Sequence, residues 1–368
     1  MATGKLVKLL IHSGVCKYLE FKSIEGSFVC REVKDELKVS KIPSTETEAL
    51  MSDLFTFFEK NRFRQFLKFA NKFDKDDKST HGGLNPYTTT MQQLLDSYKL
   101  SNSTADFVGH AVALYRDDKF LEQPYLQTIE RMKLYFYSLA RYGSSPYLYP
   151  QYGLGELPQG FSRLAAIYGG TYKLSSPIDY ILVDGDNFVG VVSEGKIAMA
   201  DQLVCDPSYV PDKVEKIGQI VRAIVIMSHR PSCFKNEVNS CQIIIPNNQA
   251  KRKSDIYITC VGKDNGVTPT GFYLALVATT VETSKPQEEV RPGLDILGKS
   301  GCVDIFYSVD DLFVPNVNGS DSQMFVSSSY DATSHFETTC DDIIRMYHAI
   351  TGEMFDMDKL ACDFTDDE

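Results

Sequence analysis

The chain has 368 residues, a hydrophobic fraction of 43% and a formal net charge of −11. This length and composition are typical of a globular protein with one large domain or two ordinary ones. The negative charge argues against nucleic-acid binding, which needs a basic surface to displace counterions from phosphates. No apolar run reaches the roughly 20 residues of a membrane-spanning helix, and the nine cysteines are scattered, so we expect a reduced, cytoplasmic protein.

The first strand-like segment is residues 17–29, where apolar and polar side chains alternate around Gly26. This pattern predicts a β-hairpin with its turn at Gly26. The charged segment 31–42 follows and has only weak strand character near its end. We therefore expect residues 1–43 to form the first part of a sheet domain.

A helical pattern then occupies residues 44–141. Apolar side chains recur at spacings of three and four in two phenylalanine-rich runs, which the polar sequence EKNR at 59–62 is expected to separate. The last predicted helix begins after Pro124 and ends at Gly143. The phenylalanine-rich runs carry more large apolar residues than one core-facing stripe needs. They fit either a tightly packed core or a hydrophobic groove for a lipid or a partner helix.

Strand patterns return after residue 142. Asp184-Gly185 between two alternating runs predicts a hairpin. Apolar runs that predict further strands, several of them buried on both faces, lie at 221–228, 240–246, 254–262 and 272–282. A capped helix is expected to end at Gly352, ahead of the acidic tail 356–368. The sequence thus predicts an α/β fold: a discontinuous sheet domain of residues 1–43 and 142–355, interrupted by an all-helical domain of residues 44–141.

A glycine-rich segment, QYGLGELPQGFSRLAAIYGG, occupies residues 151–170. A dinucleotide fingerprint, G-x-G-x-x-G, would need a third glycine where this chain has Pro158, so we expect no nucleotide cofactor. The segment instead predicts a helix with Pro158 in its first turn and Gly169-Gly170 at its end. Glu156, Gln159 and Arg163 would then offer a carboxylate, an amide and a guanidinium from one rigid element. The same spacing also fits a solvated amphipathic helix.

Candidate catalytic groups are sparse. The six histidines form no metal-binding pair, so no metal site is expected. His335 lies near Asp331 and Glu337 in the sequence, which fits either a general base or a structural histidine. We therefore expect no catalytic residue.

Six segments, in order along the chain, resemble the Rab GDP-dissociation inhibitor (GDI) family. They are PSTETEAL, ARYGSSPYLYPQYGLGELPQGFSRLAAIYGGTY, VCDPSYVPDKV, NSCQIIIP, RKSDIY and SYDATSHFETTCDD. The resemblance implies a sheet domain related to FAD-dependent oxidoreductases, an inserted helical domain, and no enzymatic activity. It also implies a monomer that binds GDP-loaded, prenylated Rab GTPases, slows GDP release and moves them between membranes and the cytosol. Family members open with a glycine-fingerprint module, and this chain is expected to begin after it.

The resemblance also implies roles for individual residues. The Rab-binding platform would include Glu156, Gln159, Arg163 and Thr171. A mobile effector loop would include Arg141 and Tyr147. The Rab C-terminal segment would bind at Ile24 and Phe28. The prenyl groove would include Leu54, Phe58, Phe66, Leu67 and Ala70.

Two other classes of protein share this fold. A flavin-dependent oxidoreductase is disfavoured by the missing fingerprint. A Rab escort protein, which acts with a prenyltransferase, is expected to match less continuously and to carry long insertions that this chain lacks.

Overall fold

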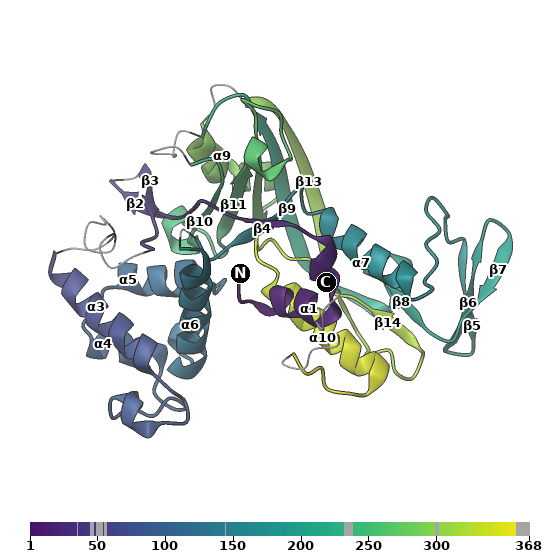
Figure 1. Cartoon of the computed structure of the whole chain (residues 1–368), viewed down its shortest axis with the longest axis horizontal. Helices are drawn as coiled ribbons and strands as arrows, with labels where there is room; N and C mark the ends of the chain where they lie inside the picture. The colour runs from purple at the N-terminus through teal and green to yellow at the C-terminus, as the bar shows by residue number, and fades with distance from the viewer. Residues whose placement is uncertain are drawn as a thin grey trace, which may run out of the picture.

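The computed structural model describes residues 1–34, 36–44, 48, 54, 57–143, 145–231, 238–298 and 302–357. A seven-stranded sheet with the strand order β13-β9-β12-β11-β10-β2-β3 lies at its centre (Figure 1). In that order the strands are Cys302–Pro315, Val214–Met227, Tyr273–Thr280, Ile256–Val261, Cys241–Ile245, Gly26–Val33 and Glu36–Lys41. The pairing of β10 with β2 is parallel, and the other five pairings are antiparallel.

The central strand β10 is buried at all five of its positions, as its apolar run predicts. On one face, Ile243 lies in a core cluster with Val277 of β12 and Leu297 of α9. On the other face, Ile244 packs with Tyr257 of β11 and with Tyr147 from the loop before β4. Helices α8 (Pro286–Glu289) and α9 (Arg291–Leu297) cover the first face. The strands predicted from residues 221–282 are confirmed as β9, β10, β11 and β12.

The start of the chain differs from the sequence-based expectation. A helix, α1 (Lys5–Ser13), precedes the short turn η1 (Val15–Tyr18), and strand β1 (Phe21–Ser23) pairs with β4 (Leu148–Pro150). The predicted hairpin at Gly26 is wrong, because β2 runs from Gly26 to Val33 and forms its hairpin with β3. Lys34 after β2 has a left-handed backbone with φ of 55°. A lysine at such a position gives no turn signal, since glycine or asparagine normally occupies it.

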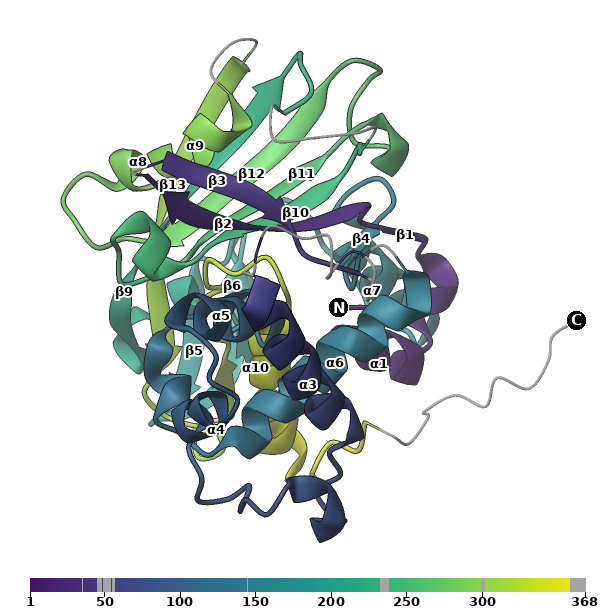
Figure 2. The ribbon, with the colours of Figure 1, turned by 90° about the vertical axis from the view of Figure 1, so that its left-hand side faces the viewer.

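The helical segment lies beside the sheet, and Figure 2 shows its helices together below β2 and β3. Its elements are α3 (Phe57–Lys72), η2 (Lys78–His81), α4 (Met91–Ser97), α5 (Asn102–Asp106), the π-helix η3 (Phe107–Val112), η4 (Asp118–Leu121) and α6 (Tyr125–Tyr142). The predicted limits of α6 are confirmed by Pro124 at its N-cap and by Gly143 at its C-cap, with φ of 81°. The expected break at 59–62 is wrong. Helix α3 continues through these residues, and Glu59 accepts hydrogen bonds from Ser101.

Large aromatic and aliphatic side chains form one core among these helices. Phe66 of α3 is fully buried with Phe107 of the π-helix and Met132 of α6 in the same cluster. The ring of Phe63 meets that of Phe107 edge-on at 5.8 Å between centroids, a favourable aromatic geometry. In the described residues, the phenylalanine-rich runs therefore form a packed core.

The remaining elements extend away from the large sheet. The predicted hairpin at Asp184-Gly185 is confirmed: β5 (Tyr180–Asp184) pairs with β6 (Asn187–Ser193), and Gly185 has a φ of 62°. With β7 (Lys196–Met199) they form a three-stranded sheet that projects to the right in Figure 1. Strand β8 (Leu203–Cys205) pairs in parallel with β14 (Met324–Val326). The predicted C-terminal helix is α10 (Glu337–Thr351), which Gly352 ends. Among the described residues, none of the helices is long and apolar enough to cross a bilayer.

One close approach in the helical segment leads to a prediction for Gly109→Ala. The new methyl group in η3 would overlap the buried ring of Phe120. We expect the free energy of unfolding to fall by about 1–3 kcal/mol, since packed cores tolerate added volume poorly. Urea denaturation measures the change. Gly218→Ala is the control, because no atom lies within 4 Å of its added methyl group, and a change within about 0.5 kcal/mol is expected. Equal effects of the two substitutions would contradict the prediction.

Candidate functional site

Helix α7, which follows β4, carries the polar residues singled out in the glycine-rich segment. It runs from Glu156 to Ile167, so the predicted helix is confirmed. Gly153 before it and Gly169 after it have φ values of 107° and 88°. These are left-handed conformations that glycine adopts at little cost, and they set the entry and exit of the chain.

Close packing against η1 fixes which face of α7 points outward. A methyl group on buried Gly160 would lie 3.0 Å from side-chain atoms of Val15 and Leu19. The small residue lets the helix backbone approach η1 closely. Leu157 and Leu164 lie on the same side of the helix and are partly buried. The opposite side is therefore held toward the surface by a rigid contact.

The polar candidates lie along one edge of this outward side, next to the face that packs on η1. Gln159, Arg163 and Thr171 are exposed, and Glu156 is partly buried. The guanidinium of Arg163 lies 4.7 Å from the centre of the Tyr18 ring. In the part of the chain that the structure describes, Arg163 forms no ion pair, so its hydrogen-bond donors remain available. Stacking on an aromatic ring pre-orients a guanidinium for a partner's carboxylate or carbonyl group.

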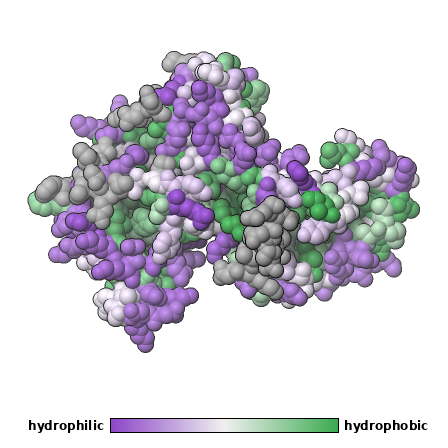
Figure 3. Space-filling view, viewed as in Figure 1, coloured by the Kyte–Doolittle hydropathy of each residue, from purple (hydrophilic) through white to green (hydrophobic). Residues whose placement is uncertain are grey.

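Exposed apolar side chains also lie on α7 and just after it. Phe161 and Tyr168, which the helical spacing puts on another face of α7 than Gln159 and Arg163, are 40% and 78% exposed. Ile167 and Tyr172 are exposed as well, and Figure 3 shows hydrophobic side chains at the surface around α7 and on the projecting sheet. Exposed aromatic residues beside an arginine are typical of protein–protein interfaces. This composition supports a docking surface more than a merely solvated helix.

Other residues singled out from the sequence lie elsewhere. Arg141 is exposed in the last turn of α6, whereas Tyr147 is buried and burial raises its pKa well above the ordinary value. The segment around Tyr147 is anchored, since its carbonyl accepts the backbone N–H of Ile24 at 3.0 Å. Ile24 and Phe28 are also buried, in two different core clusters. The structure does not bring Ile24 and Phe28 together on one surface.

The residues assigned to a prenyl groove fall into two groups. Leu54, Phe66 and Ala70 are buried in the helical core, and Leu67 packs against it with partial exposure. Phe58, in contrast, is 74% exposed. A prenyl chain could contact Phe66 or Ala70 only after α3 separates from its neighbours.

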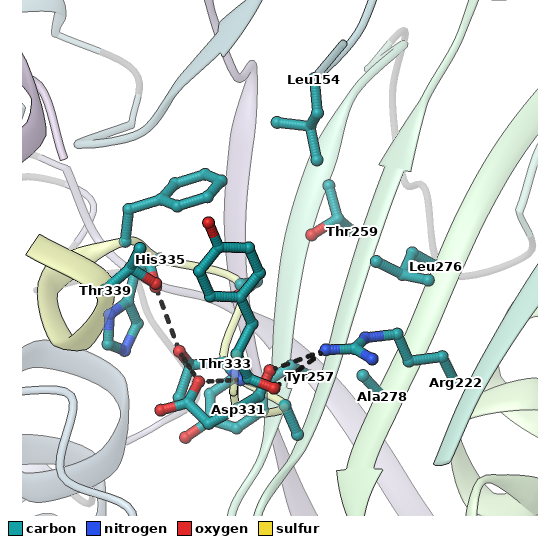
Figure 4. Close-up of a pocket in the computed structure, with 14 residues that line it drawn as sticks. Leu154, Arg222, Tyr257, Thr259, Leu276, Ala278, Asp331, Thr333, His335 and Thr339 are labelled. Atoms are coloured by element: carbon teal, nitrogen blue, oxygen red, sulfur yellow. Dashed lines mark hydrogen bonds between the residues drawn. The ribbon is translucent and has the colours of Figure 1, made fainter. Parts of the chain in front are cut away.

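A cavity of about 140 Å³ lies against the sheet face near the start of α10, and His335 is part of its lining (Figure 4). Figure 4 shows His335 at the opposite end of that lining from Arg222 and Leu276. Burial lowers the pKa of His335 to about 4, although Asp331 acts to raise it. The Asp331 carboxylate accepts hydrogen bonds from Thr333 and Arg116, not from His335. His335 is therefore a buried neutral histidine, but it differs from a satisfied structural histidine because neither ring nitrogen has a hydrogen-bond partner among the described residues. Within the described ranges no group of His, Cys, Asp and Glu side chains could hold a metal ion.

The fold and the exposed helix α7 define the general class of protein. The sheet and helices match an oxidoreductase from Methanosarcina mazei with a TM-score of 0.53 at 13% identity, over 88% of this chain and 80% of that one. At that identity the likeness shows the fold alone, and the prediction of an oxidoreductase-like α/β fold is confirmed. The chain thus has an oxidoreductase-like scaffold with an exposed polar and aromatic helix.

The particular family follows from closer matches. The family model "GDP dissociation inhibitor" matches residues 1–362. Rab GDP dissociation inhibitor beta from Rattus norvegicus is 53% identical over 360 residues, which are 98% of this chain and 79% of that protein. The crystal structure of Rab GDI from Plasmodium falciparum has a TM-score of 0.91 and 42% identity, over 97% of this chain and 82% of that one. The chain belongs to the GDP dissociation inhibitor family, and the resemblance seen in the sequence is confirmed.

Sequence analysis missed two residues that build the surface of α7. Tyr18 supports Arg163, and Gly160 sets the contact with η1. Gly160 lies within the glycine-rich segment, but no local pattern marks its partners, which lie more than 140 residues earlier in the chain.

The buried state of His335 predicts a specific pH dependence of stability. The unfolded chain binds a proton at this histidine near pH 6.5, whereas the folded chain does so only near pH 4. The stabilisation is present above pH 6.5 and is lost as the pH falls toward 4. Over that window this histidine should lower the free energy of unfolding of the wild type by on the order of 3 kcal/mol. In His335→Gln this part of the decrease should be absent. Urea denaturation at several pH values tests this, and identical pH profiles of variant and wild type would refute it.

Proposed function

We propose that this chain acts as a Rab GDP dissociation inhibitor whose docking surface is the outward side of α7. Membership of the family makes it a regulator that binds Rab GTPases, not an enzyme. The observation that carries the proposed surface is Arg163 pre-oriented on Tyr18, on a helix that also exposes aromatic side chains. The near-continuous match over 98% of the chain also favours an inhibitor over an escort protein with long insertions.

The polar residues would act as hydrogen-bonding partners for the switch regions of the GTPase. Glu156 would accept hydrogen bonds, Arg163 would donate them, and Gln159 and Thr171 could do both. The GDP form would be bound preferentially if its switch conformation fits this surface better than the GTP form does, since a ligand discriminates only by differential affinity. Holding the switch regions would slow the release of GDP.

The prenyl group of the Rab protein would occupy the helical segment. Each CH₂ removed from water contributes about 0.8 kcal/mol, so a long isoprenoid could offset its affinity for the bilayer. Entry next to Phe66 and Ala70 would require α3 to move, because both side chains are fully buried. In this scheme the helical domain of residues 44–141 holds the lipid, and the sheet domain of residues 1–43 and 142–355 docks the GTPase. The protein would work as a monomer that cycles between the cytosol and membranes.

Removal of the guanidinium tests the docking surface. Arg163→Ala should weaken the binding of a GDP-loaded Rab GTPase by about 1–3 kcal/mol, as expected for loss of a charge-assisted contact at an interface. Isothermal titration measures the affinity. Arg291→Ala is the matched control, because Arg291 is an exposed arginine on α9, away from α7, and its loss should leave the affinity unchanged. Equal affinity of wild type and Arg163→Ala would remove the docking assignment.

Extraction of a prenylated Rab from liposomes tests the transport role. The purified chain should release GDP-loaded Rab from phosphatidylcholine–phosphatidylserine vesicles into the supernatant and leave GTP-loaded Rab bound. The reason is that only the GDP complex would combine the docking contact with burial of the lipid. Sedimentation followed by immunoblotting gives the released fraction. Failure to extract either form, or equal extraction of both, would contradict the proposal.

A further inference from the structure

His110 is the feature of the fold that neither the site nor the family assignment explains. It lies in the π-helix η3 of the helical segment, and its side chain has no exposed surface. Its Nδ1 atom is 2.9 Å from Oδ2 of Asp255 and 3.1 Å from the carbonyl oxygen of Tyr115. Its Nε2 atom is 3.0 Å from Oδ1 of Asp118. Each of these three partner atoms is an oxygen that can accept a hydrogen bond.

Asp255 belongs to the sheet, just before β11, and its side chain is also fully buried. Its Oδ1 accepts the backbone N–H of Asn247 at 2.8 Å, and its Oδ2 accepts the hydroxyl of Tyr257 at 3.4 Å. Burial raises the pKa of Asp255, and the hydrogen bonds that it accepts act against that rise; donors on both of its oxygens favour the ionised carboxylate. The hydrogen bond between His110 and Asp255 thus joins the helical segment to the sheet through a buried charge pair.

A neutral imidazole has one protonated and one unprotonated ring nitrogen. In this site the unprotonated nitrogen would face a carboxylate oxygen without a proton between them, which is repulsive. We infer that His110 is held as a doubly protonated imidazolium and is a positioning residue that fixes the helical segment on the sheet. Its ring donates to both parts of the molecule at once.

The surrounding charges support this state. Burial alone would lower the pKa of His110, but hydrogen bonds and charges from Asp118 and Asp255 raise it to about 10. Burial raises the pKa of Asp106 of α5, and its electrostatic interaction with His110 acts against that rise. Tyr257, from β11, faces the site with a hydroxyl group that stays neutral, because burial raises its pKa well above the ordinary value. The groups facing His110 from η4, α5 and the sheet therefore favour the cation.

Apolar contacts between the two parts are buried as well, since Val29 of β2 lies in the core of the helical segment. One polar contact is less protected from water. Arg116 and Asp331 form an ion pair at 2.8 Å, but the arginine side chain is 57% exposed. Exposed ion pairs contribute little, whereas breaking a buried pair by removing one partner is strongly destabilising. The buried His110–Asp255 pair is accordingly a polar contact that, together with the apolar packing, fixes the position of the helical segment.

The functional consequence rests on the proposed function. If the GTPase docks on α7 and its lipid enters the helical segment, one ligand binds two tethered sites. Its affinity then depends on how well the distance between those sites is fixed. Loss of His110 should weaken binding of a prenylated Rab more than binding of the same Rab without its prenyl group.

The protonation state can be tested without any partner. Long-range ¹H–¹⁵N spectra of the full chain, with the His110 signals identified by their absence in His110→Gln, report both ring nitrogens. We expect both to be protonated at pH 7 and at pH 8.5, where an ordinary histidine, with a pKa near 6.5, is neutral. An unprotonated ring nitrogen at pH 7 would overturn the inference. If His110→Gln does not fold, Asp118→Asn, which changes only the half-exposed partner, identifies the signals by their shift.

The positioning role is tested by affinity. The ratio of the dissociation constants for unprenylated and prenylated GDP-loaded Rab should fall about tenfold or more in His110→Gln, since fixed geometry raises effective concentration. His348→Gln, at an exposed position in α10, is the matched control and should leave the ratio unchanged. If His110→Gln does not fold, Asp118→Asn replaces it, with a smaller fall expected. Equal weakening of both ligands would overturn the positioning role. If the wild-type chain binds neither ligand, the proposed function fails, while the spectra still decide the state of His110.

Discussion

Burial of β10 on both faces is the constraint on which the arrangement of the molecule depends. This strand pairs in parallel with β2, whose partner residues lie more than 200 positions earlier in the chain. The pairing brings the start of the chain into the sheet formed by its later part. The helical segment leaves this sheet after β3, where the backbone N–H of Ile42 donates to the carbonyl of Ser27, and it returns before β4, where the hydroxyl of Ser145 bonds that of Ser27 at 2.9 Å. Because both of its ends are anchored close together, the segment folds back against the sheet.

Contacts between the start of the chain and the segment after the helices also fix the position of α7. Strand β4 pairs with β1, η1 follows α1, and Gly160 lets α7 pack closely on η1. Exposed Arg163 and its aromatic neighbours are thus held by the scaffold and not by a mobile loop. A surface that is rigid before binding loses less conformational entropy when a partner docks. The oxidoreductase-like fold therefore serves as a rigid frame for the exposed face of α7.

Local patterns predicted much of this fold. Helix α6 was bounded by Pro124 and Gly143, and continuous apolar runs gave the inner strands of the sheet. The long edge strand β13 was missed, because its alternating, partly charged sequence becomes a strand only through pairing with distant β9. The site was predicted in part: spacing placed Gln159 and Arg163 together, but only tertiary packing revealed Tyr18 beneath Arg163. The paired carboxylates around His110 likewise come from separate segments.

The central claim is that a chain of this fold regulates a GTPase by holding it in the GDP state. The most direct measurement is the rate at which a Rab GTPase loaded with fluorescent GDP releases its nucleotide, with increasing amounts of this chain. The account predicts that release slows with increasing concentration and reaches a plateau when all the Rab is bound. An unchanged release rate, with complex formation verified in the same samples, would contradict it.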